Sequence, residues 1–318
     1  MSTAADRARG ALYGLAIGDA LGMPTQLMSH QQVAACFGVL DGFRAPPAGH
    51  PIASGLLAGS VTDDTEQALL LAGVLLAGGG HIDSDDLARR LIAWAEQARE
   101  RGSLDLLGPS SSAAVAALVA GGPVDEVGRA GATNGAAMRI APVGLIISCD
   151  DLDALVDLVV EASRVTHHTG VAIAGAAAVA AAVSGGIDGA SVVEATTLGI
   201  RAADLGQQRG EWVAGAAVAR RIAWSIGLMD ADNHERSVRD VVELVGTSLA
   251  TQESVPAAFA VLALHPDDPW QACLTAASLG GDSDTIAAMA GAIAGACHGI
   301  DGWPPDAVRT VQEVNSSI

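Results

Sequence analysis

The sequence predicts an all-α fold, and three observations support this prediction. Half of the residues are hydrophobic but only 3% are aromatic, so the core must consist mainly of Ala, Leu, Val, Ile and Gly. Small side chains let helices approach closely, whereas strands favour β-branched and aromatic residues. Helical patterns recur from end to end, and no long stretch alternates apolar and polar residues as a half-buried strand does.

The predicted helices have recognisable ends. The run Asp83-Ser84-Asp85-Asp86 is typical of a helix start, and the pair Gly121-Gly122 is typical of a helix end. The predicted helices span Asp6–Leu21, Asp64–Ala77, Asp83–Arg101, Ser110–Ala120, Leu152–Val165, Val171–Val183, Ala190–Leu205, Trp212–Ile226, Val238–Leu249, Val255–Leu264, Pro269–Ser278 and Thr285–Cys297. No connection between them is long enough to indicate an interdomain linker, so we expect one domain over residues 1–318.

The charge balance restricts the partners of this chain. Its formal net charge is −19, and all 17 basic residues are Arg. Nucleic-acid binding and binding to anionic membranes both require a basic surface, so we expect neither partner. An acidic surface is compatible with divalent cations. The sequence does not indicate an oligomeric state.

Cysteine usage and the N-terminus predict a cytoplasmic protein. The four cysteines are scattered without a C-x-x-C pair, which is typical of a reducing compartment and disfavours a zinc site. The first ten residues carry Asp6, Arg7 and Arg9 with no apolar run after them, unlike a signal peptide. The most apolar run, Gly170–Val183, is too short to cross a bilayer and is predicted to be a buried core helix.

The first cluster of polar residues is Thr62-Asp63-Asp64-Thr65-Glu66-Gln67, directly before an apolar run. One interpretation is structural: an acceptor followed three residues later by Glu is a capping box, and acidic residues stabilise the positive end of a helix. The other interpretation is a cation site, because Thr62, Asp63 and Asp64 offer adjacent oxygen ligands of the kind that Mg²⁺, Mn²⁺ or Ca²⁺ prefers.

The second cluster is Gly280-Gly281-Asp282-Ser283-Asp284-Thr285, again before a helix of small residues. Capping accounts for one of these aspartates but not for both together with a glycine pair. If the two clusters share a cleft, four carboxylates lie together. Like charges about 4 Å apart repel by roughly 4 kcal/mol per pair at an effective dielectric constant near 20. A pair of metal ions would remove this repulsion.

Three further segments contain glycines or histidines beside polar residues. Gly14–Gln26 ends a helix in a polar turn, and Gly131–Arg139 offers backbone N–H groups ahead of a helix, as an anion site does. The third segment, Thr166-His167-His168, precedes another helix. A histidine pair of this kind is also compatible with a surface or capping role.

Taken together, these motifs resemble the ADP-ribosylglycohydrolase family. The resemblance rests on G-x-x-x-G-D-A-L-G-M-P, T-D-D-T, N-G-A-A-M-R-x-A-P-x-G, T-H and G-G-D-S-D-T, which occur in family order from Gly14 to Gly295. The family includes dinitrogenase-reductase-activating glycohydrolases, ADP-ribosylarginine and ADP-ribosylserine hydrolases, and some lens crystallins. A set of five motifs in order is far more specific than any single one.

The resemblance implies a single-domain orthogonal helical bundle with two divalent cations, Mg²⁺ or Mn²⁺. By motif position, the implied metal ligands are Thr62, Asp63, Asp64, Asp282, Asp284 and Thr285. The implied substrate-binding residues are Gln26, Gly131, Thr133, Asn134, Gly135 and His167. Gly131 to Gly135 would receive phosphate or distal ribose, and His167 would lie near the diphosphate or distal ribose.

Gln26 is a departure from the family pattern. Many members carry a glutamate at the matching position, which gates the cleft or assists catalysis. A glutamine cannot accept a proton as a general base. This substitution weakens the expectation about the substrate more than the expectation about the reaction class.

The function expected from these observations is hydrolysis of an N-glycosidic bond to ribose. Asp63 or Asp64 would accept the proton of the attacking water, and the residues alone do not choose between them. The substrate would be an ADP-ribosylated protein side chain or a small ADP-ribosyl conjugate. Two alternatives remain: a smaller N-riboside without the ADP group, and a non-catalytic binding protein like the crystallin relatives.

Overall fold

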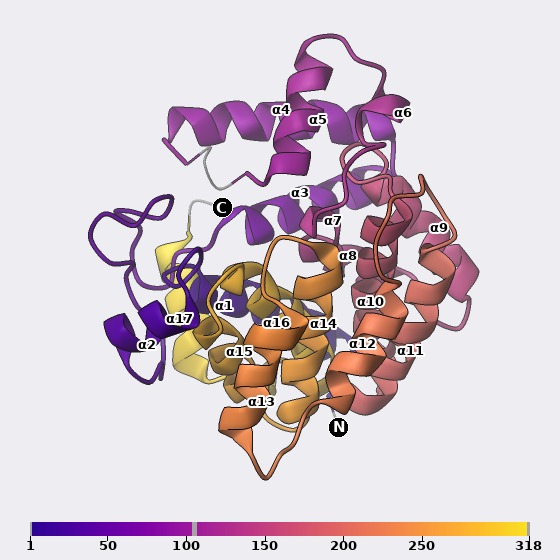
Figure 1. Ribbon diagram of the computed structural model, residues 1–318. Coiled ribbons are helices and arrows are strands. Elements are labelled where there is room, and N and C mark those ends of the chain that lie inside the picture. The colour runs from indigo at the N-terminus through magenta and orange to yellow at the C-terminus, as the bar shows by residue number, and fades with distance from the viewer. Residues whose placement is uncertain (1, 104–106, 317–318) are drawn as a thin grey trace.

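The computed structural model describes residues 2–103 and 107–316 (Figure 1). Every regular element within these residues is a helix, and the strand-like pairings there are two isolated bridges, Thr133 with Ala250 and Thr169 with Glu211. The prediction of an all-α fold is therefore confirmed.

The helices follow one another through short connections along most of the chain. In chain order they are α1 (Ala4–Gly22), α2 (His30–Phe37), α3 (Asp63–Ala77), α4 (Ser84–Glu100), α5 (Pro109–Val119), α6 (Val124–Val127), α7 (Gly135–Met138), α8 (Ala141–Ile146), α9 (Leu152–Ser163), α10 (Gly170–Ile187), α11 (Val192–Gly206), α12 (Val218–Gly227), α13 (His234–Asp240), the π-helix η2 (Val241–Val245), α14 (Thr251–Leu264), α15 (Pro269–Ser278), α16 (Ser283–His298), the 3₁₀-helix η3 (Ile300–Gly302) and α17 (Pro305–Val314).

Helices α1 and α16 pack backbone against backbone. The face of α1 that contacts α16 carries a glycine at every fourth position: Gly10, Gly14, Gly18 and Gly22. A Cβ atom on Gly18 would lie 2.0 Å from the carbonyl oxygen of Ala287, and one on Gly14 would lie 2.2 Å from that of Gly291. No side chain fits between the helices, so the end of α1 lies directly against the first turn of α16, where Gly22 contacts Asp284.

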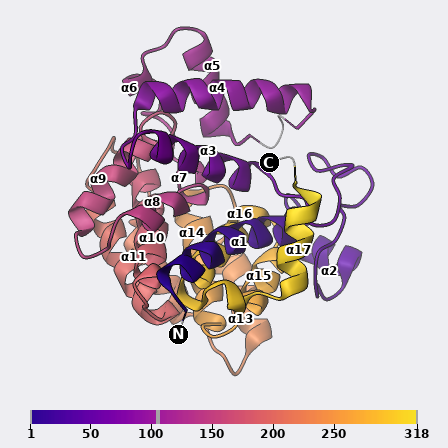
Figure 2. The same ribbon diagram turned by 180° about the vertical axis from the view of Figure 1, so that it is seen from behind.

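Helix α10 is the central helix of the main hydrophobic core. Its residues from Gly170 to Gly186 are all buried, and it packs against α8, α9, α11 and α16 (Figures 1 and 2). It is long and apolar enough to cross a membrane by length and composition, but 94% of it is buried inside the protein. This placement agrees with the buried core helix predicted for Gly170–Val183.

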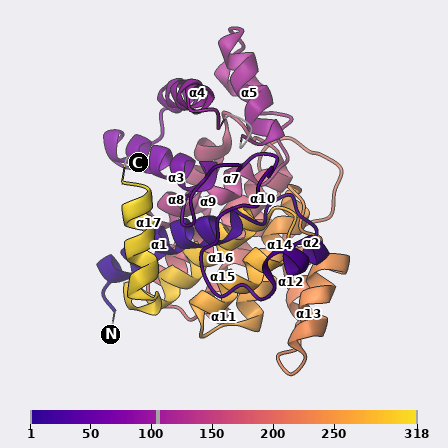
Figure 3. The same cartoon turned by 90° about the vertical axis from the view of Figure 1, so that its left-hand side faces the viewer.

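The remaining helices surround this core. Figures 1 and 2 show α4, α5 and α6 together at the top of the molecule, next to α3. Figure 3 turns the α2 side toward the viewer and shows the long connection between α2 and α3 running across it. That connection, residues 38–62, ends at the start of α3.

The helix predicted for Trp212–Ile226 begins later than expected, because α12 starts only at Val218. The chain before it instead bonds to the start of α10: the Gly170 N–H donates to the Glu211 carbonyl (2.8 Å), and the Glu211 N–H donates to the His168 carbonyl (2.8 Å). These bonds hold Glu211 in an extended pairing directly before the predicted start, and residues 212–217 follow it without helical structure. Tertiary pairing has therefore replaced the predicted helical turn.

The helix predicted for Val238–Leu249 is also displaced. It begins at His234, continues as a π-helix from Val241 and ends at Gly246, whose φ of 89° few other residues adopt. Residues 247–249 therefore lie outside the helix, and Leu249 lines the pocket described below. Sequence patterns did not indicate α2, α17 or the short helices α6 to α8.

Helix α14 starts at Thr251, four positions before its predicted start at Val255, and contains Pro256. A proline inside a helix lacks the N–H that would bond to the carbonyl four residues earlier. Here that carbonyl belongs to Gln252, and it accepts a hydrogen bond from Arg221 Nε (3.0 Å). The side chain from α12 satisfies the acceptor that the proline leaves unpaired, which explains why the helix extends past the expected boundary.

Candidate active site

The two acidic helix starts line one pocket, as the sequence predicted. The pocket encloses about 670 Å³, including open solvent at its mouth. Its lining residues are Gln26, Leu27, Ile52, Asp63, Asp64, Leu107, Gly108, Pro109, Ser111, Thr133, Asn134, Gly135, Met138, Leu249, Asp282, Asp284 and Thr285. Segments more than 200 positions apart in the chain therefore meet here.

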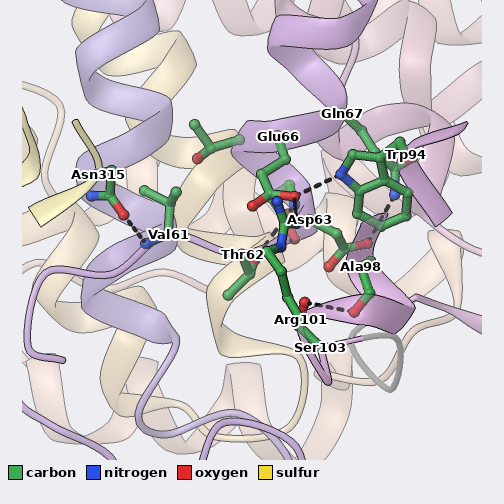
Figure 4. Close-up of polar contacts among 12 residues, drawn as sticks. Val61, Thr62, Asp63, Glu66, Gln67, Trp94, Ala98, Arg101, Ser103 and Asn315 are labelled. Atoms are coloured by element: carbon green, nitrogen blue, oxygen red, sulfur yellow. Dashed lines mark hydrogen bonds and ion pairs between the residues drawn. The ribbon is translucent and has the colours of Figure 1, made fainter. Parts of the chain in front are cut away.

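The start of α3 is capped by Thr62, whose side-chain oxygen accepts from the Asp64 N–H (3.4 Å). The capping box suggested by the sequence is not formed. Glu66 instead accepts from the indole N–H of Trp94 (2.6 Å) and from Arg101 (2.7 Å), two residues of the neighbouring α4 segment (Figure 4). Glu66 thus anchors α3 to α4 and leaves the two aspartates before it facing the pocket.

Asp19 of α1 supports this helix start from behind. Its buried carboxylate accepts from the backbone N–H of Thr62 (2.9 Å) and of Thr65 (3.1 Å), and also from both hydroxyl groups. No role was predicted for Asp19 from the sequence. Its position in G-D-A-L-G was the available signal, yet the contact spans 43 positions, which local patterns do not report.

The start of α16 is held differently. Asp282 precedes the helix without capping it; its carboxylate accepts from the side-chain amide of Asn134, and its own N–H donates to the Thr247 carbonyl (2.7 Å). The Ser283 hydroxyl donates a hydrogen bond to the Gly22 carbonyl (3.1 Å). Asp282 and Asp284 are therefore free of the capping role that would otherwise explain an aspartate at this point.

Burial and mutual repulsion raise the pKa values of the acidic cluster. Burial, followed by neighbouring carboxylates, raises the pKa of Asp63, Asp64 and Asp284 well above the usual value of an aspartate. Burial also raises the pKa of Asp19 and of Asp282 to about 6, opposed in both cases by the hydrogen bonds that the carboxylates accept. The ionised form of these carboxylates is therefore disfavoured in the protein alone, and nearby positive charge would favour it.

The donor set fits hard divalent cations. One oxygen of Asp64 and one of Asp284 are buried without a hydrogen-bond partner among the described residues, although such atoms are normally paired. The cluster consists of oxygen donors, which Mg²⁺ and Mn²⁺ prefer. In the part of the chain that the structure describes, no three His, Cys, Asp or Glu side chains already converge as a ligand group. Asp63 and Asp282 are instead bonded to Gln67 and Asn134.

Most of the predicted site residues line the pocket, but three do not. Gln26, Thr133, Asn134 and Gly135 line it together with both aspartate pairs and Thr285. Thr62, Gly131 and His167 lie outside the lining. The Thr62 hydroxyl donates to Asp19 (2.8 Å), and the Gly131 carbonyl accepts from the Thr169 hydroxyl (2.7 Å).

His167 is fully buried behind Thr133, whose hydroxyl oxygen lies 3.0 Å from the His167 Nε2 atom. His167 therefore lies behind the pocket wall instead of lining it, and the surface interpretation is wrong for this residue. The backbone N–H of Asn134, expected to face an anion, donates to the Leu249 carbonyl instead (3.1 Å). These neighbours come from distant segments, so the motif alone did not indicate them.

Gln26 lies in the turn after α1 and is nearly buried, with 4% of its surface exposed. Its side-chain Nε2 has no hydrogen-bond partner among the described residues. Its backbone carbonyl lies 2.9 Å from His50 Nε2. Because His50 Nδ1 accepts from the Ala53 N–H (3.0 Å), Nε2 must be the donor to Gln26. His50 thus ties the connection before α3 to the pocket wall.

Sequence reasoning missed part of the pocket wall. Ser111 and the residues preceding it come from the start of α5, and the apolar residues Leu27, Ile52, Met138 and Leu249 come from four separate segments. Leu27, Ile52 and Leu249 are single apolar residues in turns and loops, which carry no chemical signature, whereas Met138 is the last residue of α7 and stands in the N-G-A-A-M-R motif. They surround the acidic floor with hydrophobic surface.

The fold and the pocket together define the class: an all-α protein with a buried, carboxylate-rich pocket suited to divalent cations. Residues 1–317 match the family model described as ADP-ribosylglycohydrolase. The chain belongs to the ADP-ribosylglycohydrolase family, and the predictions of this family and of a glycosidase are confirmed.

Individual relatives agree with this assignment. The chain is 38% identical to the uncharacterized protein YegU of Escherichia coli, over 98% of this chain and 93% of that protein. It is 30% identical to an ADP-ribosylarginine hydrolase of Pseudomonas putida, over 97% of this chain and 75% of that protein. Among solved structures it resembles an ADP-ribosylglycohydrolase-related protein complex, with a TM-score of 0.73, 25% identity and coverage of 99% and 95% of the two chains.

Proposed function

We propose that this chain is a divalent-metal-dependent hydrolase that cleaves an N-glycosidic bond to ribose and removes ADP-ribose from a protein side chain or a small conjugate. One observation carries the proposal: Asp63, Asp64, Asp282 and Asp284 line one pocket, where two of their oxygens are buried without partners. Buried carboxylates in this number can be ionised together only when positive charge compensates them.

The residues that would hold two cations are Thr62, Asp63, Asp64, Asp282, Asp284 and Thr285. Thr62 is the weakest member of this set because its hydroxyl is already bonded to Asp19. Bound Mg²⁺ or Mn²⁺ would compensate the carboxylates and supply Lewis-acid polarisation of substrate and water oxygens.

The side chains of the protein would orient the substrate and move a proton. Asp63 or Asp64 would accept the proton of the attacking water, once the raised pKa of each is lowered by nearby positive charge. The remaining carboxylates would stabilise positive charge that develops on the ribose ring as the bond to C1 breaks. The apolar rim, Leu27, Ile52 and Leu249, would limit access of bulk water.

A second candidate substrate is a smaller N-riboside without the ADP group. The described residues that line the pocket include no aromatic side chain and no Arg or His. An adenine ring is often bound by stacking on an aromatic ring, and a diphosphate is often bound by Arg. Their absence from this lining favours a substrate in which ribose is the main recognised group. Gln26, in place of the glutamate common in the family, favours the same alternative.

A hydrolysis screen separates these candidates. ADP-ribosyl-arginine, ADP-ribosyl-serine, ADP-ribose-1″-phosphate and simple nucleosides would be incubated with the protein and Mg²⁺ or Mn²⁺. We expect turnover of at least one riboside, its loss on addition of a chelator and its recovery with excess metal. The matched variants are Asp282→Asn and Asp306→Asn, since Asp306 is an exposed acidic residue far along the chain in α17. Only the first should abolish turnover. If none of these compounds is cleaved under any metal condition, the non-catalytic alternative is favoured.

A further inference from the structure

A continuous chain of hydrogen bonds runs behind the pocket from Asp63 to Thr133, and its centre is the buried Arg139. On one side, Arg139 Nη1 donates to Gln67 Oε1 (2.8 Å), and Gln67 Nε2 donates to Asp63 Oδ2 (3.0 Å). On the other side, Arg139 Nη2 donates to the Thr166 hydroxyl oxygen (2.6 Å). His167 then connects Thr166 to Thr133 through contacts of 2.8 and 3.0 Å.

Arg139 is an unusual buried cation. It is 1% exposed, and it contacts an amide, a hydroxyl and a backbone carbonyl rather than a carboxylate. Burial lowers its pKa to about 10, so the guanidinium remains charged near neutral pH. A charged guanidinium is always a donor and never an acceptor. Every group that it touches must therefore present an acceptor.

This requirement fixes the orientation of Gln67. Its Oε1 must face Arg139, so its NH₂ group must face the Oδ2 atom of Asp63. The buried Gln67 is thus held as an N–H donor toward the acidic floor of the pocket.

The same requirement fixes the direction of the second branch. The Thr166 oxygen accepts from Arg139, and among the described residues its own hydrogen then has one acceptor within reach, Nδ1 of His167. A buried hydroxyl hydrogen left without an acceptor is destabilising, so Nδ1 is its acceptor. With Nδ1 as acceptor, a neutral His167 carries its proton on Nε2, which donates to the Thr133 oxygen. Burial, together with the charge of Arg139, lowers the pKa of His167 well below its usual value, so the ring stays neutral.

Thr133 is the last member of the chain and lines the pocket. Its oxygen accepts from His167, so its hydroxyl hydrogen is available, and none of the described residues is recorded as its acceptor. The hydroxyl hydrogen is therefore available to an acceptor in the pocket. A group that accepts there must be an oxygen or nitrogen lone pair of a bound molecule, for instance a ribose or phosphate oxygen.

We propose that Arg139 is a positioning residue that sets the direction of hydrogen bonding on two walls of the pocket. Through Gln67 it presents an N–H group to Asp63. Through Thr166 and His167 it makes the Thr133 hydroxyl a donor to an acceptor atom of the ligand. Thr133 is the specificity-determining contact, and His167 acts through it without touching the ligand. The role of Thr133 rests on the proposed function, whereas the hydrogen-bond directions do not.

The directions are tested without substrate by ¹⁵N NMR of the imidazole rings in the full-length protein. The resonances of His167 are assigned as those missing from the His167→Gln variant. At neutral pH we expect His167 as the neutral tautomer with protonated Nε2 and unprotonated Nδ1. In Arg139→Met, Thr166 is free to accept from the ring, and the opposite tautomer should appear. A charged ring or protonated Nδ1 in the wild-type protein would overturn the proposal, whether or not the Arg139 variant folds.

The donor role of Thr133 is tested with a pair of variants on whichever riboside the protein cleaves. Thr133→Val removes the hydroxyl and keeps the shape, and it should lower kcat/KM about ten- to a hundred-fold. Thr133→Ser keeps the hydroxyl and should stay within about three-fold of the wild-type value. Equal losses in both variants with an unchanged fold would overturn this part. Failure to cleave any riboside would contradict the proposed function, while the NMR result would still decide the hydrogen-bond directions.

Discussion

The starts of α3 and α16 present similar side chains to the same pocket, but the protein holds them in different ways. The α3 start depends on a buried charge, because the Asp19 carboxylate accepts from the backbone and hydroxyl groups of Thr62 and Thr65. The α16 start depends on close packing, because Gly22 of α1 leaves no room for a side chain beside Asp284. One start is therefore sensitive to the loss of a hydrogen-bond acceptor, and the other is sensitive to added volume.

The largest effect is expected from added volume between α1 and α16. In Gly18→Ala the new Cβ atom would lie 2.0 Å from the Ala287 carbonyl oxygen, so the two helices must separate. We expect the free energy of unfolding to fall by about 3 kcal/mol, as measured by chemical denaturation. Gly42→Ala is the matched control, because a Cβ atom at Gly42 meets nothing within 4 Å. Equal stability of the two variants would contradict the role of close packing.

A smaller loss is expected when the acceptor behind α3 is changed. Asp19→Asn keeps the shape but replaces one acceptor oxygen with an NH₂ donor, which would face the N–H and O–H groups of Thr62 and Thr65. We expect a loss of about 1–3 kcal/mol in the free energy of unfolding and weaker metal binding. Calorimetry with Mn²⁺ would measure the second effect. Unchanged stability and metal affinity would show that the α3 start does not depend on Asp19.

Neutralising a carboxylate inside the pocket should have the opposite effect on stability. Burial and neighbouring carboxylates raise the pKa of Asp284 well above its value of 3.8 in a model peptide. Between that value and the raised one, the folded metal-free protein binds more protons than the unfolded chain, so its stability falls as pH rises. Asp284→Asn removes this contribution.

We therefore expect Asp284→Asn to have a higher Tm than the wild-type protein near neutral pH in the presence of a chelator. The difference should shrink as pH falls through about 4, because the wild-type carboxyl group then becomes protonated in the unfolded chain as well. Catalytic turnover should be abolished. A lower Tm for the variant at every pH would instead indicate that Asp284 has a structural role.

The smallest and most diagnostic effects are expected at Gln26. If a carboxylate at this position assists catalysis or metal binding, Gln26→Glu should bring faster turnover or tighter metal binding. If the amide instead binds a different riboside, removing it should lower kcat/KM about ten- to a hundred-fold. The buried, unpartnered Nε2 atom favours the second outcome. Steady-state kinetics of Gln26→Glu and Gln26→Ala distinguish the two outcomes. If neither variant changes kcat/KM, Gln26 has no role in catalysis or substrate binding.

The helix boundaries show which features of the fold local sequence patterns can predict. The pattern for Pro269–Ser278 matched the helix residue for residue, because Asp268 caps it and Pro269 occupies its first turn. The pattern for Trp212–Ile226 failed at its start, because the Glu211 backbone pairs with the segment before α10. Capping acts over three residues and is visible in sequence, whereas this pairing joins residues about forty positions apart.

The sequence by itself determined the all-α class, the family and the two carboxylate pairs that meet in the pocket. Composition, helix starts and the order of motifs can all be read along the chain without knowing how it folds. Only the tertiary structure decided which groups stand behind those pairs. Asp19 reaches Thr62 across 43 positions, and Arg139 reaches Gln67 across 72. The same applies to His167, which the fold buries behind Thr133 instead of exposing it to the pocket. The partners of a buried polar group are set by the packing of distant helices, and no local pattern specifies that packing.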